Sequence, residues 1–213
     1  MIFRLDRVIP QPLADSPVSD RSIWRTVAEI KSDAITIAEA PSGTGKTTLL
    51  SMLYGVRHDY DGTVTLDSEN IRGYSIEKWG EIRRDKISVV FQDLRLFPQL
   101  TSMQNILIKN QLRPTLQEDE IRAMAVELGV DHRLETPCGK LSLGQQQRIA
   151  VIRALAQPFS FLLLDEPFSH LDHQNSKKVT ELVLKHCEKN KAGLLMTSLG
   201  PSDMFPFNEV IYI

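Results

Sequence analysis

A segment rich in glycine and threonine, residues 40–48 (Ala-Pro-Ser-Gly-Thr-Gly-Lys-Thr-Thr), constrains the fold of this chain more than any other feature. It has the spacing of a P-loop, with Ala40 at the position where that pattern begins with glycine. The segment lies between an apolar run predicted as a strand, Ala34–Ala38, and a segment predicted as a helix, Thr47–Leu53. Because a glycine-rich turn between a strand and a helix cradles phosphate groups, the sequence predicts a nucleotide-binding α/β domain.

The residue types of this segment suit a triphosphate. Gly43 and Gly45 let backbone N–H groups curl round the phosphates, and the predicted helix adds the positive end of its dipole. Lys46 can reach the β- and γ-phosphates, and the Thr47 hydroxyl can ligate Mg²⁺. The alternative is a polar loop before an unrelated helix. The predicted nucleotide-binding residues of the segment are Ser42, Gly43, Thr44, Gly45, Lys46, Thr47 and Thr48.

A second candidate motif follows the apolar run Phe161–Leu164, which is predicted as a central parallel strand. Asp165 ends this run and Glu166 follows it. At the carboxyl end of a strand, Asp165 can hold Mg²⁺, and Glu166 can polarise the attacking water as a general base. Acidic residues after a buried strand are often solvated loop residues, so this pattern gains its functional meaning from the P-loop.

The segment Leu141–Arg148 (Leu-Ser-Leu-Gly-Gln-Gln-Gln-Arg) precedes that strand in the chain. Taken alone, it predicts the start of a helix, with Ser142 at the N-cap and Ile149 and Ile152 on an apolar face. A capped helix is a complete explanation of this segment unless the other motifs give it a second one.

The rest of the chain alternates short apolar runs with helical patterns, which favours an α/β fold. The pair Asp61-Gly62 predicts a turn before an alternating strand, and residues from about 93 to 156 are predicted to be mostly helical. The remaining predicted strands are Ile2–Leu5, Ser22–Ile30, Thr63–Leu66, Lys86–Phe91, Leu194–Thr197 and Val210–Ile213, and the clearest further helices are Gln117–Leu128 and Ser176–Glu188.

The motifs occur in an order that is typical of one family. The P-loop is followed by Gln92 in Val-Val-Phe-Gln-Asp, by Leu-Ser-Leu-Gly-Gln, by Leu-Leu-Asp-Glu-Pro and by Ser169–Asp172 (Ser-His-Leu-Asp). This order resembles the ATP-binding cassette of ABC transporters, and the resemblance covers nearly the whole chain. The segment Phe91–Pro98 is most similar to the cassette group that drives lipoprotein release, macrolide export and the cell-division complex.

The resemblance implies an α/β fold of the P-loop NTPase type, with a mixed-sheet core, an antiparallel β subdomain and a helical subdomain. We expect a single ATP-binding domain over residues 1–213. The core and the antiparallel β subdomain would take about residues 1–91 and 157–213, and the helical subdomain with the signature motif about 92–156.

Cassettes of this family work as head-to-tail dimers, with ATP between the P-loop of one subunit and the signature motif of the other. The resemblance therefore implies that Ser142, Gly144 and Gln145 contact the γ-phosphate bound by the opposite subunit, a task that suits a helix N-terminus. ATP binding would close the dimer and hydrolysis would release it. The implied partners are a second cassette, in a homodimer or a heterodimer, and a membrane-spanning transporter subunit.

The resemblance also implies roles for the polar residues of the site. Lys46 and Glu166 would act on the γ-phosphate and on the attacking water, and Gln92 would sense Mg²⁺ and that water. Thr47, Gln92 and Asp165 would hold the Mg²⁺. The cofactors implied are thus ATP and Mg²⁺.

The loop segment Leu94–Leu100 is rich in apolar residues. It would form the groove for a coupling helix of the membrane subunit. Packing inside the helical subdomain is the alternative, and the two explanations can hold for different residues of the segment.

This sequence departs from the family pattern at three places. Ser198 stands where the family normally places a histidine that contacts the γ-phosphate, so it takes that place in the predicted catalytic set. The loss of one such contact typically costs on the order of 10²–10³ in rate, so we expect slow hydrolysis unless another group substitutes. The region Val8–Leu13 has no aromatic side chain to stack on adenine, so we expect loose base selectivity. Leu143 replaces a glycine of the signature motif.

Composition limits the remaining classes of function. The chain has 213 residues and a formal net charge of −2, which gives no support for a nucleic-acid partner such as that of DNA- or translation-associated ABC proteins. No apolar run is long enough to span a membrane, and the N-terminus does not resemble a signal peptide. Cys138 and Cys187 are expected to be reduced thiols, although the sequence leaves a disulfide between them open.

The sequence thus predicts the ATP-binding subunit of an ABC transporter, which hydrolyses ATP to ADP and phosphate. We expect it on the cytoplasmic face of a membrane, bound peripherally through a membrane subunit. The alternative is a regulatory switch, in which ATP closes the dimer but turnover is negligible and the membrane partner is regulated.

Overall fold

The computed structural model describes residues 1–200 and 202–213. Its centre is a five-stranded sheet in which every neighbouring pair of strands is parallel. The apolar run predicted as a central parallel strand lies inside this sheet as β7. In spatial order the strands are β6 (Ile87–Val90), β7 (Phe161–Asp165), β8 (Gly193–Ser198), β3 (Ile35–Glu39) and β9 (Glu209–Tyr212).

The α-helices of the described residues are α1 (Lys46–Leu53), α2 (Ile76–Asp85), α3 (Ser102–Leu112), α4 (Glu118–Glu127), α5 (Leu143–Leu155) and α6 (His173–Asn190). Short 3₁₀ helices lie in the connections between helices and strands: η1 (Gln11–Leu13), η2 (Ile71–Gly73), η3 (Asp131–Arg133) and η4 (Cys138–Lys140). The helices α1, α4 and α6 agree with the predicted helices within a few residues at each end.

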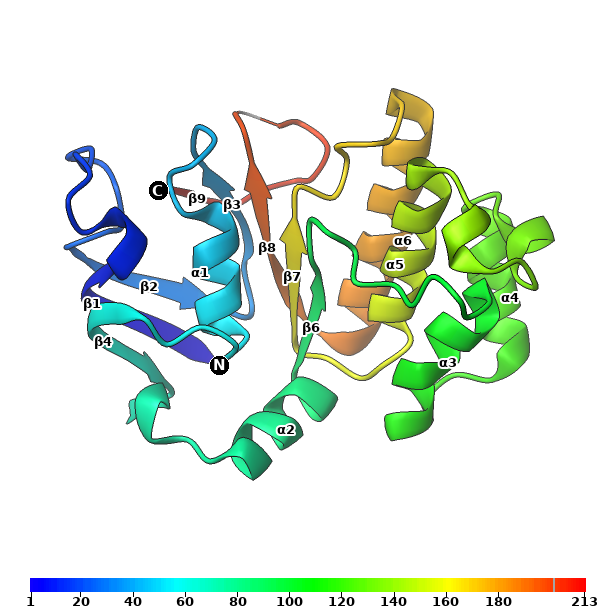
Figure 1. The fold of residues 1–213 in the computed structure, drawn as a ribbon, viewed down its shortest axis with the longest axis horizontal. Helices are drawn as coiled ribbons and strands as arrows, with labels where there is room; N and C mark the ends of the chain where they lie inside the picture. Colours follow the sequence, from blue (N-terminus) through cyan, green and yellow to red (C-terminus); the bar gives the residue numbers. More distant parts are fainter. Residues whose placement is uncertain (201) are drawn as a thin grey trace.

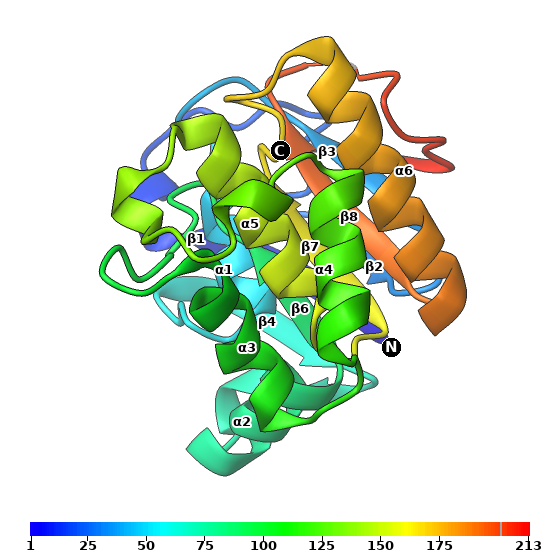
Figure 2. The ribbon, with the colours of Figure 1, turned by 90° about the vertical axis from the view of Figure 1, so that its right-hand side faces the viewer.

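Alternate residues of the parallel strands face opposite layers of helices, as the period of two in a strand requires. Leu162 and Leu164 of β7 pack in one buried cluster with residues of α5 and α6, whereas Phe161 and Leu163 pack in a second cluster with residues of α1. Figure 1 shows the resulting layers, with α1 on one side of the sheet and α5 and α6 on the other. Helices α3 and α4 lie outside α5, on the face turned to the viewer in Figure 2.

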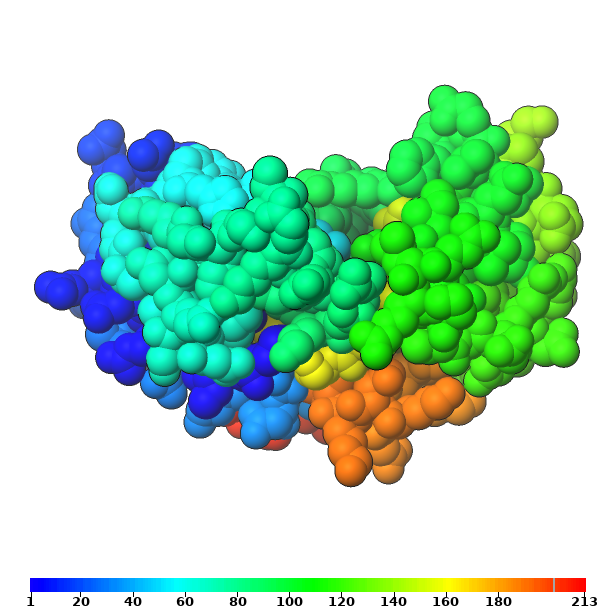
Figure 3. All heavy atoms as spheres, turned by 90° about the horizontal axis from the view of Figure 1, so that it is seen from below, coloured from blue at the N-terminus to red at the C-terminus, as the bar shows by residue number. Residues whose placement is uncertain are grey.

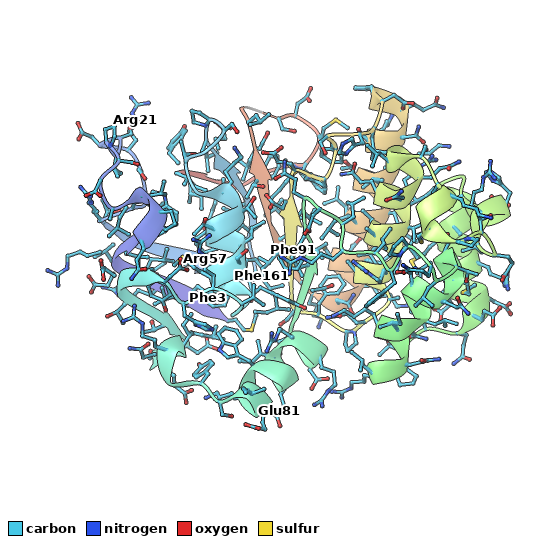
Figure 4. All side chains as sticks on the ribbon, viewed as in Figure 1. Phe3, Arg21, Arg57, Glu81, Phe91 and Phe161 are labelled. Carbon is cyan, nitrogen blue, oxygen red and sulfur yellow. The ribbon has the colours of Figure 1, made fainter. Side chains whose placement is uncertain are left out.

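A second sheet is antiparallel and has the order β2-β1-β4-β5, formed by β2 (Val27–Lys31), β1 (Ile2–Pro10), β4 (Tyr60–Leu66) and β5 (Glu69–Asn70). Phe3 of β1 packs on Phe161 of β7 with their ring centroids 6.4 Å apart, which joins the two sheets (Figure 4). This sheet lies on the α1 side of the parallel sheet (Figure 1).

The predicted turn at Asp61-Gly62 is wrong, because both residues lie within β4. Gly62 has a φ of +85° and lies at the irregularity where the pairing of β1 with β4 shifts register. A Cβ on Gly62 would come within 2.7 Å of the carbonyl carbon of Arg7. Glycine is therefore required here by the close approach of two backbones at a bulge, which has the same sequence signature as a turn.

The predicted strand Ser22–Ile30 is also only partly correct, since the regular strand begins at Val27. The residues before it turn, and they bury Trp24, whose side chain is 2 % exposed. Trp24 belongs to the buried cluster that includes residues of the antiparallel sheet, and its Nε1–H also donates to the Thr44 carbonyl at 3.1 Å. Trp24 therefore stabilises the glycine-rich segment through this hydrogen bond.

Two further features concern the chain as a whole. No helix among the described residues is both long enough and apolar enough to cross a membrane. Cys138 and Cys187 are free and buried, and burial raises the pKa of the Cys187 thiol to about 12.

Candidate nucleotide-binding site

The predicted site residues lie at the carboxyl ends of the parallel strands. The segment 40–48 follows β3, Gln92 follows β6, Asp165 ends β7 with Glu166 directly after it, and Ser198 ends β8. Parallel strands bring their carboxyl ends to one edge of a sheet, where ligands bind in open α/β folds. A cleft of about 450 Å³ opens there, lined by Pro12, Leu13, Ser42, Gly43, Gly45, Lys46, Thr47, Thr48, Gln92, Glu166 and Leu199.

The glycines of the P-loop segment adopt backbone angles that other residues avoid. Gly43 and Gly45 have φ values of +83° and +105°. A Cβ on Gly45 would lie 2.8 Å from Cδ1 of Leu13 and 3.1 Å from Cζ2 of Trp24. Gly45 is also the N-cap of α1 and offers no side-chain cap, so the first N–H groups of the helix are left for another acceptor. This geometry is suited to an anion.

Lys46, Gln92 and Glu166 converge in the cleft from three different elements. The Lys46 side chain is buried, and its Nζ donates to the carbonyls of Ala40 and Pro41, both at 2.9 Å. The same Nζ lies 3.4 Å from Oε1 of Glu166, and Nε2 of Gln92 donates to the other carboxylate oxygen of Glu166 at 3.4 Å. Two of the predicted catalytic residues, Lys46 and Gln92, thus each contact a third, Glu166.

Thr197 ties this group to the neighbouring strand, and the sequence analysis missed it. Its hydroxyl donates to Oδ1 of Asp165 at 2.7 Å and accepts the Glu166 N–H at 3.1 Å. Glu166 has a φ of +47°, so its backbone needs such support. A signal was present in the sequence, since Thr197 is the polar residue that ends the predicted strand directly before Ser198.

The oxygen atoms around Asp165 are of the type that binds Mg²⁺ in proteins. Asp165 is 1 % exposed, and its Oδ2 is buried without a hydrogen-bond partner among the described residues. A buried carboxylate oxygen without a partner is costly, and a cation would satisfy it. Thr47 and Gln92 line the cleft described above, whereas Asp165 is not among the residues that line it. These oxygen donors fit a hard divalent cation.

Ser198 is half-buried, and its hydroxyl accepts the Gly200 N–H at 3.4 Å. It lines a second cavity of about 170 Å³ together with Glu166, Phe168 and Leu199. A side chain larger than serine therefore has space beside Glu166. A histidine at position 198 could place its imidazole in this space, whereas Ser198 does not reach into it with a ring.

Ser142, Gly144 and Gln145 lie together at the N-terminus of α5, and none of them lines the cleft of the P-loop. Ser142 and Gln145 form a capping box: the Gln145 N–H donates to Ser142 Oγ at 3.3 Å, and the Ser142 N–H donates to Gln145 Oε1 at 3.1 Å. A Cβ on Gly144 would lie 2.8 Å from the His170 carbonyl, so only glycine allows this approach. Leu143 is 55 % exposed and points to the surface.

Gln147 is a second residue that the sequence analysis did not single out. Its side chain is buried, donates to the Glu166 carbonyl at 3.3 Å and accepts the His170 N–H at 3.2 Å. It thereby links α5 to the loop that follows β7.

Residues 29–169 match the family model described as ABC transporter. The chain belongs to this family. Among its curated relatives is the ABC transporter ATP-binding protein YxdL of Bacillus subtilis, which is 30 % identical over 92 % of this chain and 77 % of that protein. The lipoprotein-releasing system ATP-binding protein LolD of Hydrogenovibrio crunogenus is 34 % identical over 73 % of this chain and 70 % of that protein. The thiamine import ATP-binding protein ThiQ of Shigella sonnei is 36 % identical over 76 % of this chain and 69 % of that protein.

Solved structures agree with this assignment. One is the dimeric structure of MJ0796, a bacterial ABC transporter cassette. The match covers 100 % of this chain and 94 % of the MJ0796 chain, with a TM-score of 0.80 and 28 % sequence identity. The dimeric MJ0796 cassette in a post-hydrolysis state bound to ADP and Pi has a TM-score of 0.78 and 27 % identity over the same shares. This ABC cassette is therefore an ATP-binding subunit of a transporter and an ATPase, and it works with a second cassette and a membrane subunit.

The segment Leu94–Leu100 of this cassette divides into buried and exposed residues. We call it the docking segment after the role that the sequence analysis expects for it. Leu94 is 5 % exposed, whereas Phe97 is 52 % exposed. Asn105 of α3 holds the segment, since its Oδ1 accepts the Phe97 N–H at 2.8 Å and its amide donates to the Phe97 carbonyl at 3.0 Å. Packing within the helical part therefore explains Leu94, and Phe97 is left on the surface.

Proposed function

We propose that this cassette hydrolyses ATP with Mg²⁺ at a site shared between two subunits, and that it turns over slowly because Ser198 replaces an imidazole. The observation that supports this most strongly is the contact of Lys46, Gln92 and Glu166 at the carboxyl edge of the parallel sheet. A structural salt bridge alone would not need the glycine-rich loop and the free helix N-terminus beside it.

The proposed mechanism assigns one task to each residue. Lys46 exchanges its contacts with two carbonyls for the β- and γ-phosphate oxygens. Glu166 accepts a proton from the attacking water while the bond between the γ-phosphorus and the bridging oxygen breaks and ADP leaves. Gln92 orients that water through its amide. Thr47, Gln92 and Asp165 would hold Mg²⁺, which neutralises charge on the phosphate oxygens when it is bound.

The signature residues complete the site of the second subunit. Ser142, Gly144 and Gln145 are proposed to contact the γ-phosphate held by the partner's P-loop, since none of them lines the cleft of their own chain. Residues of about 92–156, the proposed helical subdomain, carry both this motif and the docking segment. Exposed Phe97 is proposed to contact the membrane subunit, which would hold the cassette peripherally at the cytoplasmic face.

Multiple-turnover release of phosphate tests this function. We expect a low but measurable rate for the wild-type protein, and a fall of about 10²–10⁴ in Glu166→Gln, because this change removes the proposed base. The ATP affinity of Glu166→Gln should be unchanged. Equal rates in the two proteins would contradict the proposal.

The regulatory switch remains the second candidate, and Ser198 is the observation that favours it. A wild-type rate equal to that of the Glu166→Gln blank, together with ATP-dependent dimer formation, would support the switch.

A further inference from the structure

Two exposed leucines lie next to the candidate site residues. Leu143 begins α5 and is 55 % exposed, and Leu199 follows β8 and is 62 % exposed. Single exposed apolar side chains are normal on a protein surface and need no explanation. These two differ because Leu143 lies between Ser142 and Gly144 of the signature motif, and Leu199 directly follows Ser198. The proposed function brings these two segments together from different subunits.

Leu199 is part of the nucleotide cleft of its own chain. It lines the cleft of about 450 Å³ together with Lys46 and Glu166, and it also lines the neighbouring cavity of about 170 Å³. Phe168 and Met196 line that smaller cavity as well. The exposed side chain of Leu199 therefore offers an apolar surface close to the place where the γ-phosphate is proposed to bind.

Leu143 has the opposite placement, because it does not line the cleft of its own chain. The turn that carries it is held by its neighbours, since Arg148 Nε donates to the Gly144 carbonyl at 3.1 Å. The capping box of Ser142 and Gln145 fixes the start of the helix as well. Leu143 thus projects from a turn that is already ordered in the single chain, which lowers the entropic cost of a contact with another molecule.

The two leucines lie at the same end of the molecule. Gly144 approaches the His170 carbonyl, and His170 follows β7 in the chain, so α5 begins near the edge where β7 and β8 end. This edge is at the top of Figure 1. The view from below in Figure 3 shows the surfaces of α2, α3 and α6 at the opposite end. One face of the chain therefore carries an apolar group at the cleft and an apolar group in the signature motif.

We propose that this cassette pairs with a second copy of itself, and that Leu143 of one copy packs on Leu199 of the other when ATP closes the dimer. This inference rests on the proposed function, in which the signature residues face the cleft of the second subunit. It adds the identity of that subunit and an apolar contact beside the nucleotide.

The distribution of apolar groups selects a second copy as the partner. A two-fold dimer forms each contact twice and requires both contributing surfaces on one chain, and this chain has both. A partner with the usual glycine of the signature motif at the position of Leu143 would leave Leu199 in water. When the two leucines cover each other, apolar surface is removed from water, which stabilises the closed dimer.

Dimer formation with ATP tests the proposal. The parent protein is Glu166→Gln, in which slow hydrolysis lets the ATP-bound dimer accumulate, and the dimer fraction is measured by analytical ultracentrifugation over a range of protein concentrations. Leu143→Asn and Leu199→Asn keep the approximate size of the side chain and remove its apolar character, so each should weaken the dimer at least about tenfold. Leu112→Asn is the matched control and should dimerise like the parent, because Leu112 is 56 % exposed on α3 and lies outside the cleft.

Conservative variants separate apolar character from other effects of the substitution. Leu143→Met and Leu199→Met keep an apolar side chain and should dimerise within about threefold of the parent. The asparagine variants should melt at the temperature of the parent, since both leucines are exposed in the single chain. Dimer formation by the two asparagine variants equal to that of the parent would overturn the inference. An equal loss in the methionine and asparagine variants would overturn it as well, because apolar character would then not decide.

A disulfide between two copies tests the contact itself. Leu143→Cys and Leu199→Cys are prepared as separate proteins in the Glu166→Gln background, mixed, and oxidised with ATP or with ADP. The native Cys138 and Cys187 are buried, so they should not compete. We expect a linked dimer in the mixture with ATP, but not with ADP and not from either protein alone. Absence of a linked dimer in the mixture with ATP would overturn the proposed contact.

The outcomes distinguish this inference from the proposed function. Phosphate release that depends on Glu166, without an ATP-dependent dimer of this chain alone, would overturn the inference and leave the proposed function in place. The partner would then be a different cassette. Absence of both the ATP-dependent dimer and the Glu166-dependent phosphate release would refute the proposed function and the inference with it.

Discussion

The two sides of the nucleotide cleft are built from different kinds of contact. On the P-loop side, the backbone of Gly43 and Gly45, the first turn of α1 and the group around Glu166 are all in place. The second side of the site, as we call it, consists of Ser198, which lies beside Glu166, and of the region Val8–Leu13, whose Leu13 lies beside Gly45. The family pattern predicts a histidine at Ser198 and an aromatic ring in Val8–Leu13, and this chain has neither.

This difference indicates which residues of the site can be replaced without loss of the fold. We expect contacts to the phosphates from backbone groups at the ends of parallel strands, which the fold itself maintains. We expect contacts to the base and to the departing phosphate from single side chains, which can be replaced without disturbing the sheet. We therefore expect ATP binding to be strong on one side of the cleft and catalysis to be limited by the other.

The largest effect is expected on the intact side, at Lys46. Lys46→Met removes the cation that contacts Glu166 and is proposed to move to the phosphates, so turnover should fall by about 10²–10³ and ATP affinity should fall with it. The measurement is ATP binding by fluorescence titration together with phosphate release. Lys31→Met on β2, outside the cleft, is the control. Unchanged ATP affinity in Lys46→Met would show that the P-loop side does not bind phosphate as described.

A smaller effect is expected where the two sides meet, at Thr197. Thr197→Val keeps the shape but leaves Asp165 Oδ1 and the Glu166 N–H without their shared partner. Because it is a positioning residue, we expect activity to fall about 10- to 100-fold and the Mg²⁺ concentration for half-maximal activity to rise. Thr197→Ser keeps the hydroxyl and should restore both values. A loss of activity with an unchanged Mg²⁺ requirement would count against this role.

The smallest effect is expected in the region Val8–Leu13, where the adenine base is expected to bind. Pro12 is exposed and lines the cleft, and Pro12→Tyr would offer a ring for stacking. Since stacking contributes about 1–3 kcal/mol, ATP affinity should rise about tenfold. Gln11→Tyr, also exposed but outside the cleft lining, should change nothing. The wild-type protein should bind ATP and GTP with similar affinity, and a steep preference for ATP would show that another group recognises adenine.

The same distinction explains what the sequence could predict. Apolar runs such as Phe161–Leu164 predicted the parallel strands, and the glycines predicted the P-loop, because the order of the motifs along the chain favoured these explanations over the alternatives. The prediction of a turn at Asp61-Gly62 was wrong because a bulge and a turn can both require a glycine with positive φ. Helix α2 was missed because only Trp79 and Ile82 are buried on it, and Gly80 weakens its helical pattern.

The candidate site was predictable only in part. Family motifs led to Lys46, Gln92 and Glu166, and their contacts agree with that choice. Thr197 and Gln147 act through hydrogen bonds to residues far away in the sequence, which no local pattern reveals.

The measurement that tests the account most directly is the single-turnover ATPase rate of Ser198→His beside Ser198→Ala. The cavity of about 170 Å³ next to Ser198 and Glu166 gives an imidazole room. The account predicts that Ser198→His raises the rate at least about tenfold, part of the 10²–10³ that one transition-state contact typically supplies, and that Ser198→Ala leaves it near wild type. A Ser198→His rate equal to the wild-type rate, with ATP binding intact, would contradict the claim that this side of the cleft limits hydrolysis.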